Sequence, residues 1–81
     1  MPRAKRDRSQ DALLPPLGQA VRAARKERGV SQEGLAYATG IERAHMGRIE
    51  RGEANVSFLN LMKIASALDM DLSQIVKAAG Y

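Results

Sequence analysis

Residues 30–52 read VSQEGLAYATGIERAHMGRIERG and contain two short helical patterns joined at a glycine. Ser31 can cap a first helix over residues 32–39, because its hydroxyl can accept a hydrogen bond from an N–H group of the first turn. Gly40 stands where a left-handed residue commonly ends a helix. The second pattern predicts a helix over about residues 43–51, which ends at the glycine that follows.

Helices of this length are marginal when isolated in water, where roughly 12–15 residues are needed. Their value therefore lies in how they are placed against each other. Ala36 is small enough for the second helix to cross close over the first, and Met46 and Ile49 form the inner face of that second helix. Its outward face carries Arg43, Ala44, Gly47, Arg48 and Arg51. This pattern predicts a helix-turn-helix whose second helix probes the major groove of DNA.

The composition limits what the chain can be. At 81 residues there is room for one small domain with one core. The absence of cysteine excludes disulfides and thiolate metal sites and fits a reducing cytoplasm, where we expect the protein to lie with the nucleoid. A single histidine offers no imidazole cluster, and we expect no cofactor, no metal and no enzymatic activity. Apolar runs are too short for a membrane span or a signal peptide.

The net charge of +4 is spread unevenly along the chain. Residues 1–11 carry +2 and residues 12–29 carry +3, whereas residues 30–52 are neutral and residues 53–81 carry −1. A basic N-terminal half suits a polyanion such as nucleic acid. Charge alone fits a solubilising surface equally well.

Residues 1–16 are polar and basic and end in two prolines, which predicts a flexible N-terminal arm before a domain over residues 17–81. The arm's basic side chains could follow phosphates or enter a minor groove. They are Arg3, Lys5, Arg6 and Arg8. A disordered terminus without a DNA contact is the alternative, and we favour it.

Three further helices complete the expected fold. Apolar residues at helical spacing predict helices over about residues 17–28, 58–68 and 72–79. Asp71, followed three residues later by Gln74, forms a capping-box pattern before the last of them. No strand alternation or hairpin signal is present. The sequence therefore predicts an all-α fold of five short helices around one core.

Arg25 lies at the edge of the apolar stripe of the first expected helix, beside Val21 and Ala24. A buried guanidinium requires an anionic partner. Glu50, on the inner side of the second motif helix, is the candidate. The alternative is a solvated arginine near a helix end.

Residues 17–76, about three quarters of the chain, resemble the Cro and phage-repressor family of helix-turn-helix transcription regulators, of lambda-repressor-like fold. The residues that carry the resemblance are Arg25, Ser31-Gln32-Glu33, Leu35-Ala36, Gly40, Ile49-Glu50-Arg51-Gly52, Ile64-Ala65 and Ala67-Leu68. The Ile-Glu-Arg-Gly ending and the loop at residues 55–57 are most similar to controller proteins of restriction–modification systems.

The resemblance implies which residues read bases. Arg43, Ala44 and Arg48 match positions that face base edges, where arginine suits guanine and alanine suits a thymine methyl. His45 is a further candidate for a base or backbone contact, although an exposed histidine without a DNA role is the more common case.

The resemblance also assigns contacts outside base reading. Gln32 matches a glutamine that binds a phosphate at a helix N-terminus. Arg51 and Asn55 match phosphate-contacting positions after the probe helix. Arg25 and Glu50 match the pair that forms an internal salt bridge in these domains.

Three positions depart from the family pattern. Gly34 stands where an acidic residue usually completes a capping box, and glycine within a helix costs about 0.8–1.0 kcal/mol relative to alanine. Glu42 replaces the usual serine or threonine cap of the probe helix and places a negative charge near DNA phosphates. Gly47 lies in mid-helix, where it either allows close approach of the backbone to DNA or is merely tolerated.

A single probe helix reads about four to five base pairs, which is too few for useful specificity, so we expect a homodimer on a (pseudo)palindromic operator. The dimer surface is expected on the last helix and the adjacent part of the one before. Its predicted residues are Leu72, Ile75, Val76, Ala79, Leu59 and Met62.

The leading hypothesis is a transcription regulator that binds double-stranded operator DNA as a homodimer. The alternative is an antitoxin or protein-interaction adaptor that uses the same scaffold. Glu33, near the front of the motif, is an acid that could contact RNA polymerase, but one residue does not establish activation. No small-molecule ligand is expected, because the chain has no room for a separate sensor domain.

Overall fold

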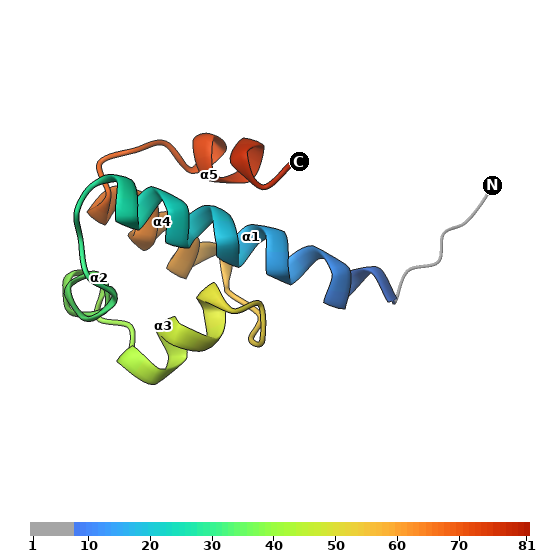
Figure 1. The fold of residues 1–81 in the computed structure, drawn as a ribbon, viewed down its shortest axis with the longest axis horizontal. Helices are drawn as coiled ribbons and strands as arrows, with labels where there is room; N and C mark the ends of the chain where they lie inside the picture. The colour runs from blue at the N-terminus through green and yellow to red at the C-terminus, as the bar shows by residue number, and fades with distance from the viewer. Residues whose placement is uncertain (1–7) are drawn as a thin grey trace.

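The computed structural model describes residues 8–81 and contains five helices, with no strand in that range (Figure 1). In chain order they are α1 (Arg8–Glu27), α2 (Gln32–Thr39), α3 (Arg43–Glu50), α4 (Phe58–Ala67) and α5 (Leu72–Ala78). The predicted all-α class is confirmed. The ends of the last four helices agree with the predicted ends to within one residue.

The first helix begins earlier than predicted. α1 starts at Arg8 rather than near Leu17, so residues 8–16 are helical and do not belong to a flexible arm. The rest of the predicted arm, including Arg3, Lys5 and Arg6, lies outside the described residues.

The physical reason for the longer helix is tertiary contact around the two prolines. Pro15 and Pro16 each remove a backbone donor and would normally end or kink a helix. Here Pro15 packs against the backbone of Gly52, in the loop after α3. The Tyr81 hydroxyl donates a hydrogen bond to the Leu13 carbonyl oxygen at 3.0 Å. Contacts with both the α3–α4 loop and the C-terminal residue therefore support this end of α1.

The helix starts follow the capping residues seen in the sequence. The Ser31 hydroxyl accepts from the Gly34 N–H at 2.9 Å, and the Ser57 hydroxyl accepts from the Asn60 N–H at 3.0 Å. At the start of α5, the Gln74 side chain accepts from the Asp71 N–H at 2.7 Å, as in a capping box.

One hydrophobic core joins all five helices. Its largest fully buried side chains are Val21, Leu35, Met46, Ile49, Ile64, Leu68 and Ile75. Every helix contributes at least one of them, and Leu68 is the C-cap residue that follows α4. Burying each such side chain stabilises the fold by about 1.5–3 kcal/mol, which explains how helices of seven to ten residues persist here.

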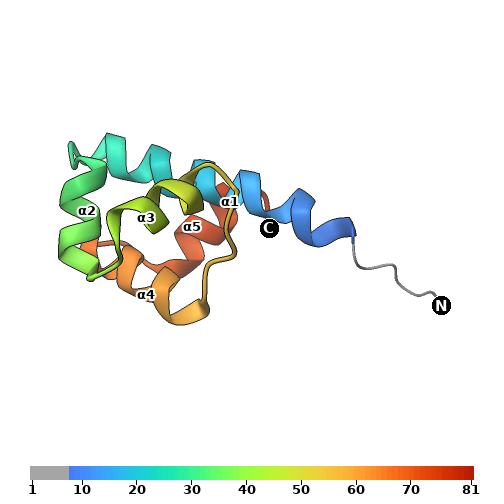
Figure 2. The ribbon, with the colours of Figure 1, turned by 90° about the horizontal axis from the view of Figure 1, so that it is seen from below.

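The arrangement places α3 at one edge of the molecule. Figure 1 shows α3 below α1 and α5 above it, and α1 contacts both of these helices. Figure 2, seen from below, has α3 in front of the other helices. α3 is thus presented outward on a scaffold made by the other four helices. None of the helices in the described part of the chain has the length and apolar character needed to span a membrane.

Candidate nucleic-acid interface

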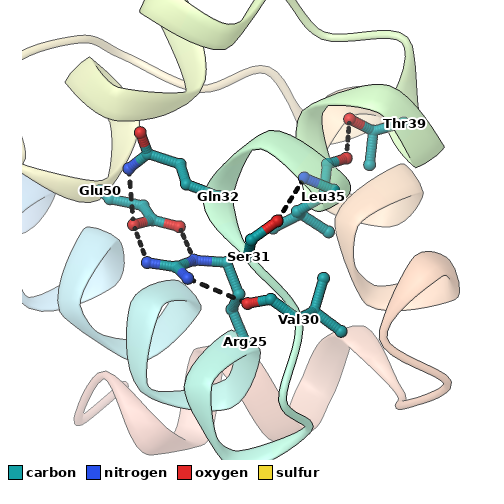
Figure 3. Close-up of polar contacts among 8 residues, drawn as sticks. Arg25, Val30, Ser31, Gln32, Leu35, Thr39 and Glu50 are labelled. Carbon is teal, nitrogen blue, oxygen red and sulfur yellow. Dashed lines mark hydrogen bonds and ion pairs between the residues drawn. The ribbon is translucent and has the colours of Figure 1, made fainter.

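The turn between α2 and α3 is made by Gly40 and Thr39. Gly40 has φ of 76° and its N–H donates to the Ala36 carbonyl at 2.9 Å, which ends α2 in a left-handed residue. The Thr39 hydroxyl donates to the Leu35 carbonyl at 2.8 Å (Figure 3). It also accepts from the Ile41 N–H at 3.3 Å. The side chain of Thr39 therefore ties both sides of the turn together.

The two faces of α3 differ in burial. Met46 and Ile49 are 0% and 2% exposed and lie in the core. On the other side, the exposed residues are Arg43, Ala44 and Arg48, followed by Arg51 directly after the helix. The outward face therefore carries three guanidinium groups and one small apolar side chain.

A buried ion pair connects α1 to the end of α3 (Figure 3). The Arg25 Nε and Nη2 donate to the two carboxylate oxygens of Glu50 at 2.7 and 3.0 Å. The Arg25 Nη1 donates to the Val30 carbonyl at 3.0 Å, so the guanidinium also holds the chain that enters α2. The two side chains are only 9% and 2% exposed. The salt bridge expected between these residues is thus present, buried and bidentate.

Gln32 belongs to the same network. Its Nε2 donates to Glu50 Oε1 at 3.0 Å (Figure 3), and this bond uses one of the two amide protons. The first N–H groups of a helix have no partner within the helix. The backbone amides of Gln32 and Glu33 accordingly offer donors beside this side chain.

His45 is half-buried, and its Nδ1 lies 3.3 Å from Arg48 Nη2. A guanidinium is a donor without acceptor capacity, so the imidazole nitrogen accepts in this contact. The histidine therefore touches one of the predicted base readers within the protein itself.

The residues after α3 extend the basic face. Arg51 Nε lies 3.1 Å from Glu53 Oε1, and both side chains are more than half exposed. Asn55 is exposed in the same loop. Glu42 takes the N-cap position of α3 but makes no capping hydrogen bond through its side chain, so its charge faces solvent at the front of the probe helix.

The residues predicted for dimerisation fall into two groups. Leu59 and Met62 are 60% and 47% exposed, and Leu72, Val76 and Ala79 are half-buried. Ile75, in contrast, is 0% exposed. The prediction that Ile75 lies on a dimer surface is therefore corrected. Its side chain lies in the hydrophobic core, where it packs α5 onto α1 and α4.

Apolar side chains are also exposed at the start of α4 and along the N-terminal part of α1. Phe58 is 68% exposed next to Leu59. An apolar hollow is lined mainly by Leu13, Leu14, Leu17, Leu61, Val76 and Tyr81. α1 contributes Leu13, Leu14 and Leu17, and the first two belong to the segment that had been expected to be an arm.

Two further residues that position the site were missed. Gly18 faces the end of α3: a Cβ at this position would meet the backbone carbonyl oxygens of Ile49 and Glu50 within 2.6 Å. The sequence did contain a signal for this contact, since Gly18 lies seven residues before Arg25 and therefore on the same face of α1. The Arg28 Nε donates to the Leu68 carbonyl at 2.6 Å and holds the end of α4 against α1, a contact for which the sequence carried no signal.

These features define a helix-turn-helix protein, with α2 and α3 as the motif and α1, α4 and α5 as its support. A profile described as helix-turn-helix matches residues 21–75. The chain therefore belongs to the HTH_3 family of helix-turn-helix transcription regulators, and the resemblance drawn from the sequence is confirmed.

Individual relatives agree with this assignment. The control protein C.SmaI of Serratia marcescens is 34% identical over 64 residues, which are 79% of this chain and 76% of that protein. The transcriptional regulator SutR of Escherichia coli is 37% identical over 60 residues, but this chain spans only about a third of the length of SutR. The crystal structure of the restriction–modification controller C.AhdI from Aeromonas hydrophila is similar, with a TM-score of 0.77 and 42% identity over 79% of this chain and 97% of that one.

Proposed function

We propose that the protein is a sequence-specific transcription regulator that binds a (pseudo)palindromic operator as a homodimer, with α3 in the major groove. The observation that carries this proposal is the division of α3 into a buried apolar face and an exposed face with Arg43, Arg48 and the adjacent Arg51. The core holds α3 rigidly at the edge of the molecule, which is the placement a groove-reading helix needs.

Base reading is assigned to the exposed side chains of α3. Arg43 and Arg48 each present a guanidinium fork that matches the O6 and N7 acceptors of guanine. Ala44 lies between them and suits a thymine methyl. His45 contributes through its contact with Arg48 or directly at the edge of the helix.

Phosphate binding is assigned to residues that flank α3. Gln32 offers an amide proton beside the N-terminal N–H groups of α2, where the helix dipole also favours an anion. Arg51 and Asn55 supply exposed donors at the other end of the probe helix. Contacts of this kind set the position of the protein on the duplex and carry no sequence information themselves.

Alanine substitutions should separate these two roles. Arg43→Ala and Arg48→Ala should each lower the preference for particular base pairs by about 1–3 kcal/mol, because a bidentate contact with guanine is lost. Gln32→Ala should weaken binding to all sequences by a similar factor. Selection of bound sequences from a random DNA pool gives the operator, and fluorescence anisotropy on operator and scrambled duplexes then measures each variant. Equal losses on both duplexes for all three variants would contradict the assignment of base readers.

The dimer is proposed to form through the exposed apolar side chains of α4 with the half-buried ones of α5. Leu59 and Met62 lead this surface, and Leu72, Val76 and Ala79 adjoin it. In a two-fold dimer the same patch meets itself. The two α3 helices would then lie about 34 Å apart, one turn of DNA.

Charge placed on this surface should dissociate the dimer. Leu59→Asp combined with Met62→Asp should weaken dimerisation by at least about 100-fold, because two carboxylates would have to be desolvated in each half of the interface. Tyr37→Asp is the matched control, since Tyr37 is 90% exposed on α2 and does not belong to the proposed dimer surface. Sedimentation velocity at several concentrations measures the change. A wild-type protein that sediments as a monomer at high micromolar concentration would contradict the dimer.

An antitoxin or protein-interaction adaptor is the second candidate function. It is favoured by the exposure of Phe58, Leu59 and Met62, which together form an apolar surface that a protein partner could cover. One observation distinguishes the two functions: an adaptor that does not read DNA would enrich no sequence from the random pool.

We propose that the regulator needs no cofactor or small-molecule ligand and acts in the bacterial cytoplasm at the nucleoid. Glu33 is a surface acid that would be available to RNA polymerase.

A further inference from the structure

Gly47 occupies the middle of α3, where glycine is unfavourable. A glycine within a helix costs about 0.8–1.0 kcal/mol relative to alanine. The position is nevertheless buried, although it lies toward the basic side of the helix rather than in the core. Something other than the hydrophobic core therefore covers it.

The covering groups are the ends of two polar side chains from different parts of the motif. A Cβ built at Gly47 would lie 3.2 Å from Arg51 Nη1 and 3.4 Å from Gln32 Oε1. No backbone atom outside the helix approaches as closely. The missing Cβ thus leaves a shallow recess in which a guanidinium and an amide oxygen converge.

Both side chains are held from their other ends. Glu50 accepts from Gln32 Nε2, which turns the amide so that Oε1 faces the recess. Glu53 lies 3.1 Å from Arg51 Nε. The Arg51 side chain is 57% exposed, and the N–H groups of its Nη2 take part in neither of these two contacts.

We propose that Gly47 is a positioning residue for phosphate binding: its recess lets Arg51 and Gln32 meet over the probe helix, so that they bind the DNA backbone as one unit. This inference rests on the proposed function. An amide oxygen is a hydrogen-bond acceptor that can orient a nearby guanidinium, which leaves the other N–H groups of the guanidinium to the phosphate. The glycine that leaves this recess lowers the stability of α3 but allows the Arg51 guanidinium to take this orientation.

A methyl group in the recess should separate the two effects. Gly47→Ala should raise the melting temperature, because the helix gains a better former and the atoms it meets are flexible ends of side chains. The same variant should bind DNA about 3- to 10-fold more weakly, by a similar factor on operator and scrambled duplexes, because a phosphate contact is displaced rather than a base contact.

A double-mutant cycle tests whether the effect passes through Arg51. In an Arg51→Ala background, Gly47→Ala should leave the affinity for DNA unchanged, while the rise in melting temperature remains. An equal loss of affinity in both backgrounds would overturn the proposal, since glycine would then act by letting the helix backbone approach DNA. Unchanged affinity of Gly47→Ala in the wild-type background would overturn it as well. Failure of the wild-type protein to bind any duplex would instead refute the proposed function, and the two failures are distinct.

Discussion

Arg25→Ala should lower the free energy of unfolding by about 3–5 kcal/mol, because it leaves a buried carboxylate without its main partner. Glu50 would keep only the hydrogen bond from Gln32, and the Val30 carbonyl would lose its donor. Native domains are stable by roughly 5–15 kcal/mol, so the loss is a large part of the total. Urea unfolding followed by far-ultraviolet circular dichroism, at fixed protein concentration, measures it.

The control for this prediction removes both charges. Replacing Arg25 with Met and Glu50 with Leu together should restore much of the lost stability, since an apolar pair of similar size avoids the stranded charge. Gly18 is unchanged in that variant, so α1 should still pack closely against the end of α3. An unchanged midpoint for Arg25→Ala would show that the ion pair does not contribute as its burial implies.

Gly18→Ala should destabilise the protein by about 3 kcal/mol, at the upper end of the range for overpacking. The added methyl would overlap the carbonyl oxygens of Ile49 and Glu50, and these are backbone atoms that cannot move aside alone. α1 would therefore have to separate from α3. The sign of the change in unfolding free energy is informative, because replacing glycine with alanine at an exposed helical site would instead raise stability by about 0.8–1.0 kcal/mol.

Gln19→Ala is the matched control for this change. Gln19 is the exposed neighbour of Gly18 in α1, so its replacement by alanine tests helix propensity without packing. We expect a small stabilisation of at most a few tenths of a kcal/mol. Urea titrations of both variants in parallel give the comparison. A stabilised Gly18→Ala protein would mean that α1 and the end of α3 are not in close contact.

Local signals predicted most of the secondary structure. Ser31 and Ser57 cap helices through hydrogen bonds to residues three positions later, and Gly40 takes its left-handed conformation where one helix must end. Such signals depend on neighbours in sequence, which is why they could be read without a structure. The partnership of Arg25 with Glu50 was also accessible, since a charge on an apolar stripe requires a counter-charge on an inward face.

Non-local contacts account for the differences. From local sequence, the prolines at residues 15 and 16 indicated the boundary between an arm and the first helix. α1 nevertheless continues through them, because Gly52 packs against Pro15 and the Tyr81 hydroxyl donates to the Leu13 carbonyl. Ile75 has the apolar character of an interface residue as well as of a core residue. Only the packing of α5 shows that the Ile75 side chain is buried in the core of the chain itself.

The sequence by itself determined the helices, the turn and the basic character of the probe helix, because capping, periodicity and charge are properties of short segments. The tertiary structure decided how far α1 extends, which apolar side chains stay exposed, and that the side chains of Gln32 and Arg51 converge over Gly47. The physical reason is that each of these depends on atoms brought together from distant parts of the chain, where the space left by a missing Cβ or the loss of solvent is visible only after packing.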